Sequence, residues 1–220
     1  MLHGNRAGGV PRGRDAGACA DRSPDHYRFS GSLICHLLPI SQRRGVGGTI
    51  RDVDAKQIEI GFARQGDAPT LALMSRDLIE SGLGWTYRAP RMAEMIDEPD
   101  NIALVTRDAT RIVGFAIMGF GDERAHLALL AVRPTHWRRG IGRRMLTWLL
   151  ESATVAGMAS IHVELRADNT PAFIMYQAMG FTETLRVPRY YAGREPAVRM
   201  VRVLRAPGTV APVWRPPARA

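Results

Sequence analysis

Hydrophobic and polar positions alternate with two different periods along the middle of the chain, and the change of period separates strands from helices. Four stretches are expected to form helices, and three of them end at a glycine. Short apolar or alternating runs bounded by turn residues predict strands. The predicted helices cover residues 67–81, 90–96, 141–156 and 171–180, and the predicted strands cover 57–64, 101–108, 111–120, 125–132, 160–165, 181–191 and 197–204.

The order of these elements predicts one α/β domain over residues 57–204. Along the chain they read β-α-α-β-β-β-α-β-α-β-β, which favours a mixed sheet with helices on both faces. Two pairs of strands are close enough in sequence to form hairpins. The turn Asp108-Ala109-Thr110 joins the first pair, and a turn around Gly193 joins the second.

Capping residues mark where the helices begin. Asp67 or Thr70 can cap the first helix, and Thr170 can cap the last one, which then starts with Pro171. The apolar stripe of the third helix includes Trp148, Leu149 and Leu150. We assign this stripe to the core rather than to a functional site, because helical spacing of apolar residues is typical of a buried face.

The two ends of the chain have a different composition from the middle. Residues 1–56 are rich in Gly and Arg and show no sustained period, so we expect a disordered extension, and the Pro-rich segment 205–220 is expected to be disordered too. The ends also carry most of the net charge of +9, because residues 1–56 contribute +4 and 205–220 contribute +3. The middle is left with +2, which argues against specific binding of nucleic acid.

Other classes of protein are also disfavoured by composition. No apolar run reaches the roughly 18 residues that span a bilayer, and the nearest candidate, Gly31–Ile40, is short and broken by His36 and Pro39. We therefore expect a cytoplasmic protein with no membrane partner. Cys19 and Cys35 lack metal-ligand spacing, so we predict reduced thiols and no metal site.

One loop has the composition of an anion site. In the segment HWRRGIGRRML, Gly140 and Gly142 let another group approach the backbone, because neither has a Cβ atom. The helix that follows offers unpaired amide N–H groups, and Arg138, Arg139 and Arg143 add positive charge. The spacing fits neither a P-loop nor G-x-G-x-x-G, and the alternative is a basic surface turn.

Two longer segments together resemble a known family. VELRADNTPAFIMYQAMGF (163–181) looks like the second half of the acetyl-CoA site of the GNAT superfamily of N-acetyltransferases, and LLAVRPTHWRRGIGRRMLTWLL (129–150) is similar to that family's pyrophosphate-binding strand, loop and helix. The resemblance covers roughly residues 57–204 and implies a GNAT-like, mostly antiparallel sheet. Bacterial ribosomal-protein alanine N-acetyltransferases are the most similar, since they share a terminal pattern that reads here Tyr190, Tyr191, Gly193, Glu195, Ala197 and Met200.

The resemblance implies a binding role for two groups of residues. The main chain of Leu130, Ala131 and Val132 would bind the pantetheine arm of acetyl-CoA. The backbone N–H groups that would hold its pyrophosphate belong to Arg138, Arg139, Gly140, Ile141, Gly142 and Arg143. Asn169 would also contact the cofactor. One departure is Trp137, because the family usually has Gln or Arg there.

Acetyl transfer to an amine requires a proton acceptor, because α-amino groups (pKa about 7.7–8.0) and lysines (about 10.4) are mostly protonated at neutral pH. Glu164 is the candidate, 12 residues before Tyr176, which is the spacing in the ribosomal-protein enzymes. It would need a raised pKa or a water relay, and the alternative is a solvated strand glutamate. His162 could relay the proton, and His126 is an alternative base.

Tyr176 would protonate the departing thiolate, since its hydroxyl is a suitable proton donor. The acceptor amine stays open: a protein N-terminus, or a small molecule such as an amino acid, polyamine or antibiotic. Residues 82–97 and 189–196 would line its site, with Trp85 and Tyr87 in the first segment. Two other functions also stay open: a catalytically silent CoA-binding module, and a protein that binds nucleic acid through its basic ends. The protein could be a monomer or a homodimer.

Overall fold

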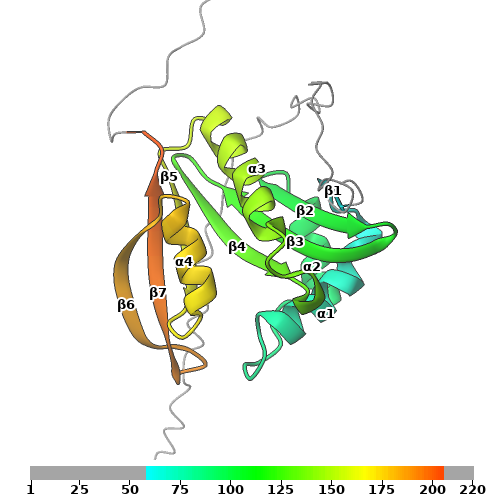
Figure 1. Cartoon of the computed structure of the whole chain (residues 1–220), viewed down its shortest axis with the longest axis horizontal. Coiled ribbons are helices and arrows are strands. Elements are labelled where there is room, and N and C mark those ends of the chain that lie inside the picture. Colours follow the sequence, from blue (N-terminus) through cyan, green and yellow to red (C-terminus); the bar gives the residue numbers. More distant parts are fainter. Residues whose placement is uncertain (1–57, 206–220) are drawn as a thin grey trace, which may run out of the picture.

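A seven-stranded sheet in the order β1-β2-β3-β4-β5-β7-β6 organises the chain (Figure 1). The computed structural model describes residues 58–205, so the predicted extension over 1–56 and almost all of 205–220 lie outside the described residues. The strands are β1 Ile58–Phe62, β2 Asn101–Asp108, β3 Arg111–Phe120, β4 Arg124–Val132, β5 Ser160–Arg166, β6 Thr182–Tyr191 and β7 Glu195–Val203. All neighbouring strands are antiparallel except β4 and β5, which confirms the mostly antiparallel α/β sheet.

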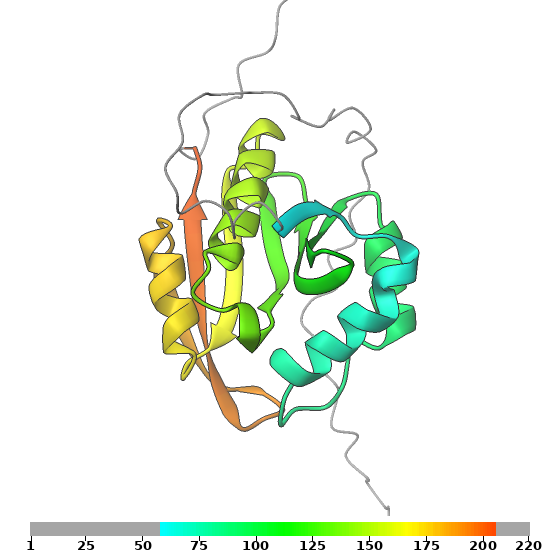
Figure 2. The same ribbon diagram turned by 45° about the vertical axis from the view of Figure 1, so that its right-hand side comes forward.

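Four helices cover the two faces of this sheet, as the sequence predicts. They are α1 Ala68–Leu78, α2 Ala89–Asp97, α3 Ile141–Val155 and α4 Thr170–Ala178, with short 3-10 turns η2 Gln65–Asp67 and η3 Pro134–His136. Figure 2 shows α1 and α2 together on the right, apart from α3 and α4. The alternation along β2 explains two cores, because Ile102 and Leu104 pack with α3 while Ala103 and Val105 pack with α1 and α2.

Several predicted element ends are wrong, and side-chain hydrogen bonds explain two of them. Helix α1 stops at Leu78 instead of continuing to residue 81, because Glu80 folds back to accept hydrogen bonds from the following loop. Helix α4 is capped by Asn169, whose side chain accepts from the N–H of Ala172 at 3.2 Å, so the predicted cap Thr170 is the first helical residue instead. Strand β1 ends at Phe62 and α3 at Val155, each slightly earlier than expected.

The cap of α1 also differs from the prediction. Asp67 does precede the helix, but its side chain makes no capping hydrogen bond to it. Its carboxylate accepts instead from the N–H of Arg64 and from the guanidinium of Arg107, both at 2.8 Å. Asp67 therefore links the start of α1 to strand β2 and does not cap the N-terminus of the helix with its side chain.

The parting of β4 and β5 is the feature that positions the site. Their parallel ladder covers only four residue pairs, from Arg124 with Ser160 to Leu127 with Val163. On the other side of β4, Ile117 pairs with Leu129 and Met118 with Leu127, so Ala128 is the extra residue of a β-bulge. Bulges bend the strand that carries them. Beyond Ala128 the two strands have no mutual pairing, and they diverge in Figure 1.

Candidate active site

Glu164 lies on β5 where that strand parts from β4. The buried side chains of β5 alternate with a second face that carries His162, Glu164 and Arg166. Oε2 of Glu164 is 2.5 Å from Nε2 of His126 on β4, and Oε1 is 3.3 Å from Nε of Arg199 on β7. Only 20% of the Glu164 side chain is exposed. This carboxylate therefore lies between two basic groups and is not a solvated strand glutamate.

These neighbours decide the pKa of Glu164. Burial is the largest single effect and on its own would raise the pKa. The hydrogen bond with His126 and the charges of His126, Arg199 and His162 outweigh it together, so the pKa lies below its ordinary value of 4.5. The expectation of a raised pKa for Glu164 is therefore wrong for this structure. The other possibility, a water relay, stays a prediction.

His162, the predicted relay, lies beside this cluster. Its Nε2 is 3.0 Å from the hydroxyl of Ser160, and burial together with the charges of Arg124 and His126 lowers its pKa. A lowered pKa favours the neutral imidazole. The structure therefore places His162 near Glu164 but directs its ring toward a serine at the start of β5.

Tyr176 lies on α4 and is buried, with 5% of its surface exposed. Its ring meets the edge of Phe181 at a centroid distance of 5.4 Å, and the N–H of Phe181 donates to the carbonyl of Tyr176. Burial, with a smaller effect from the nearby Tyr191, raises the pKa of the hydroxyl above 10.0. Tyr176 therefore keeps its proton at neutral pH, as a proton donor must, while the same shift makes its hydroxyl a weaker acid.

Two further tyrosines are within electrostatic range of Glu164. Burial raises the pKa of Tyr87 most, and the charges of Glu80 and Glu164 raise it further. The pKa of Tyr191 is raised by burial first and then by Tyr190 and Glu164. Each of the predicted acceptor segments 82–97 and 189–196 therefore places a tyrosine close enough to Glu164 to feel its charge.

The loop before α3 has the geometry of an anion site. Arg138 and Gly140 both have positive φ, 63° and 74°, which turns the chain sharply into the helix. The N–H of Arg144 makes the first intrahelical bond, to the carbonyl of Gly140 at 2.9 Å. The amides of residues 141–143 therefore precede the helical ladder at the positive end of the helix dipole. The side chains of Arg138, Arg139 and Arg143 are exposed around them.

Two side chains fix this loop to the sheet. The indole N–H of Trp137 donates to the carbonyl of Val132 at 2.6 Å, and 60% of Trp137 is exposed. Nε2 of His136 is 3.1 Å from Oδ2 of Asp108 in the β2–β3 hairpin. Trp137, the departure from the family pattern, thus has a structural role at the end of β4. The carbonyl of Val132 accepts its hydrogen bond from this indole.

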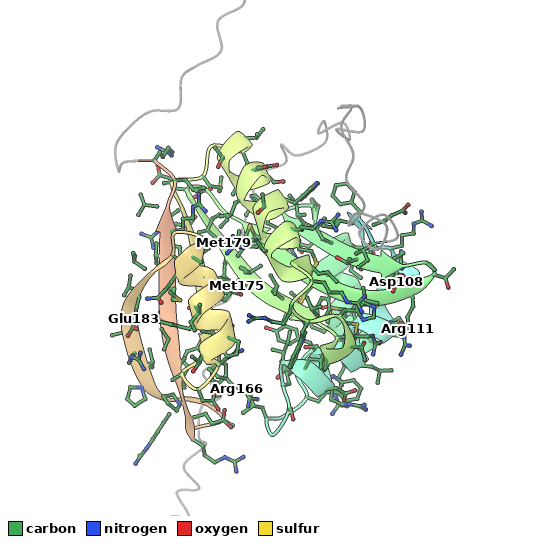
Figure 3. The ribbon with its side chains drawn as sticks, viewed as in Figure 1. Asp108, Arg111, Arg166, Met175, Met179 and Glu183 are labelled. Atoms are coloured by element: carbon green, nitrogen blue, oxygen red, sulfur yellow. The ribbon has the colours of Figure 1, made fainter. Side chains whose placement is uncertain are left out.

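The loop, the end of β4 and α4 converge at Gly142. A Cβ atom built on Gly142 would lie 3.5 Å from Sδ of Met175, 3.7 Å from Leu130 and 3.8 Å from Val132. Met175 is labelled on α4 in Figure 3. Residues predicted to bind the pantetheine and the pyrophosphate therefore lie together in space, on the same side of the sheet as α4.

Three residues near the site were missed by the sequence analysis: Glu80, Arg166 and Arg199. Arg199 alternates with buried residues of β7, which indicates an outward face, but no pattern in the sequence identifies Glu164 as its partner across the sheet. Within residues 58–205, no group of three or more His, Cys, Asp or Glu could hold a metal ion. None of the helices in this range is long and apolar enough to cross a membrane.

Comparison with known proteins identifies the family. The family model described as the acetyltransferase (GNAT) family matches residues 72–181. The ribosomal protein bS18 alanine N-acetyltransferase of Salmonella typhimurium is 34% identical over 103 residues, 46% of this chain and 68% of the relative. The chain belongs to the acetyltransferase (GNAT) family, which confirms the predicted family.

The same class of enzyme from Escherichia coli gives two further comparisons. Its sequence is 34% identical over 93 residues, which is 41% of this chain and 63% of that relative, less than two thirds of its length. Its crystal structure superposes with a TM-score of 0.60 and 25% identity, covering 70% of this chain and 99% of the other. The similarity of structure confirms the predicted GNAT-like fold.

Proposed function

We propose that this protein transfers the acetyl group of acetyl-CoA to a primary amine, and that the amine is the α-amino group of a protein N-terminus. The observation that carries the proposal is the parting of β4 and β5, with the pair of His126 and Glu164 at its start and the buried hydroxyl of Tyr176 on α4. Membership of the acetyltransferase family supports the reaction. The relatives that act on ribosomal protein bS18 support the choice of an α-amine.

The donor would bind along the end of β4 and the start of α3. The main chain of Leu130, Ala131 and Val132 pairs with β3 on one side only, and its side toward β5, which has no strand partner, suits the amides of the pantetheine arm. The pyrophosphate would accept hydrogen bonds from the N–H groups of the loop, namely those of Arg138, Arg139, Gly140, Ile141, Gly142 and Arg143. Asn169 uses its side-chain oxygen to cap α4, which leaves its amide NH₂ to contact the cofactor.

The reaction is a direct attack. The amine nitrogen adds to the thioester carbonyl carbon, and the C–S bond of the tetrahedral intermediate then breaks to release CoA thiolate. The proton lost by the amine goes to the pair of His126 and Glu164. The hydroxyl of Tyr176 gives its proton to the sulfur and recovers one from solvent. Because the pKa of Glu164 is lowered, an imidazole oriented by this carboxylate, or a water between Glu164 and the amine, is a better proton acceptor than the carboxylate alone.

Release of CoA from acetyl-CoA tests the proposal. The substrates are a peptide with a free N-terminal alanine, the same peptide with a blocked N-terminus and an internal lysine, and a panel of amino acids and polyamines. We expect turnover with the free N-terminus and none with the blocked peptide. Turnover with small amines alone would move the acceptor to that class. Tight binding of acetyl-CoA without turnover on any acceptor would favour a silent CoA-binding module.

A further inference from the structure

Arg166 joins three segments that are distant in sequence. It follows Glu164 by two residues on the same face of β5, and only 23% of its side chain is exposed. Its Nη2 donates to the carbonyls of Ile79 at 3.2 Å and Ser81 at 2.5 Å. Its Nη1 lies 3.1 Å from Oε2 of Glu195. Figure 3 shows Arg166 below α4, on the side of the loop that follows α1.

The first of these segments, residues 79–88, is held at both ends. Arg166 binds carbonyls at its start. Near its end, the N–H groups of Thr86 (2.6 Å) and Tyr87 (3.3 Å) donate to the carboxylate of Glu80, which is buried and also accepts from the hydroxyl of Ser75. The loop that carries Tyr87 therefore has a defined position relative to β5.

The second segment, residues 189–196, connects β6 to β7. The N–H of Arg194 donates to the carbonyl of Tyr191, and Tyr191 pairs with Glu195 across the hairpin. Oε2 of Glu195 is buried and accepts no hydrogen bond from the described residues, so its ion pair with Arg166 offsets its charge. Arg166 thus connects the hairpin that carries Tyr190 and Tyr191 to the same strand.

We propose that Arg166 is a positioning residue that fixes the two acceptor-side segments, residues 79–88 and 189–196, near Glu164 and thereby determines the affinity for the acceptor amine. This rests on the proposed function. A guanidinium suits the role, because its planar fork can reach two carbonyls and a carboxylate together, whereas a lysine ammonium offers a single point. Arg166 acts through these segments and leaves the donor side untouched.

The test compares R166Q and R166K with R205Q in the full-length protein. Arg205 is a matched control, since it is also 23% exposed and bonds to a carbonyl, that of Gly157, and a carboxylate, that of Glu123, at the other end of β5. We expect R166Q to raise the acceptor KM about tenfold or more, R166K to raise it less, and both to keep the acetyl-CoA Kd within about twofold. An unchanged acceptor KM in R166Q, or an equal rise in R205Q, would overturn the proposal.

Hydrogen exchange gives a readout that needs no turnover. In R166Q the amides of both acceptor-side segments should exchange faster than in the wild type, while in R205Q neither should change. Faster exchange in one segment only, or in neither, would contradict the proposed link. If the wild type turns over no amine but R166Q still loosens both segments, the link stands and the proposed function fails.

Discussion

Nε2 of His126 lies 2.5 Å from Oε2 of Glu164, so that two strands are joined by side chains at the point where their main-chain ladder ends. The imidazole is half exposed, whereas the carboxylate is mostly buried. If the N–H of Nε2 donates to Glu164, the other ring nitrogen, Nδ1, is left free to accept a proton. The pair is thus arranged as an oriented base, in which each residue needs the other.

This arrangement predicts that H126Q and E164Q each lower kcat by about 10²-fold, the usual contribution of general acid–base catalysis. The double variant should lose little more than either single one, because residues that act as a unit are not additive. Steady-state kinetics with an N-terminal peptide measure this. Wild-type kcat in H126Q, together with a large loss in E164Q, would instead assign the base to Glu164 acting through water.

The lowered pKa of Glu164 predicts how stability depends on pH. A carboxylate whose pKa is lower in the folded state stabilises the fold above its ordinary pKa of 4.5, and this contribution is lost as pH falls through the folded value. E164Q should therefore lower the melting temperature at neutral pH, and the difference from the wild type should shrink in acid. The control is E183Q, because Glu183 pairs with the exposed Arg186 and such surface pairs contribute little. A difference that grows in acid would contradict the assignment.

Y176F should separate catalysis from folding. The ring keeps its packing on Phe181, so the melting temperature should change little, while kcat should fall by roughly 10²-fold because the thiolate loses its proton donor. Burial raises the pKa of the hydroxyl, so wild-type activity should show no loss from ionisation of Tyr176 below its ordinary value of 10.0. A pH–rate profile and a thermal melt check both points. Unchanged kcat would remove Tyr176 from the mechanism.

G142A tests whether the loop before α3 binds the donor. The added methyl would make only ordinary contacts, 3.5 Å or more, with Met175, Leu130 and Val132, so the protein itself should tolerate it. It would lie where the donor approaches the backbone, and we expect the acetyl-CoA KM to rise roughly tenfold with little change in melting temperature. G61A is the control, since nothing lies within 4 Å of a Cβ at Gly61 on β1. Equal acetyl-CoA KM values in the two variants would count against a donor site here.

Local patterns were enough to predict most of the fold, because each element has its own period and its own breaker residues. They failed where a distant side chain decides the outcome. The end of α1 depends on Glu80 and Arg166. Arg166 is 87 and 85 residues away in sequence from Ile79 and Ser81, whose carbonyls it binds. The cap of α4 failed for a local reason instead: Thr170 has the usual chemistry of a cap, but the adjacent Asn169 has it too and comes first.

In the candidate site, too, local sequence identified the residues but not the properties that depend on distant neighbours. The glycine loop, Glu164 and Tyr176 stand in segments that the resemblance covers, so the sequence was enough to name them. The pKa of Glu164 could not be predicted, because it depends on His126 and Arg199, which come from strands on either side of β5. Their proximity follows from the strand order, and no single stretch of sequence contains that order.

The short ladder between β4 and β5 also has a mechanical consequence. It leaves the sheet as two plates, β1–β4 and β5–β7, whose main chains are joined by only four residue pairs. The plates are otherwise held by the apolar core that α3 and α4 share, by the pair of His126 and Glu164, and by the bonds of Arg166 to the loop after α1. A donor lying between the parted strands would bridge the plates with its own amides and act as a removable eighth strand. Twisting of one plate against the other should then be the softest motion of the empty protein and the one most damped when the donor binds.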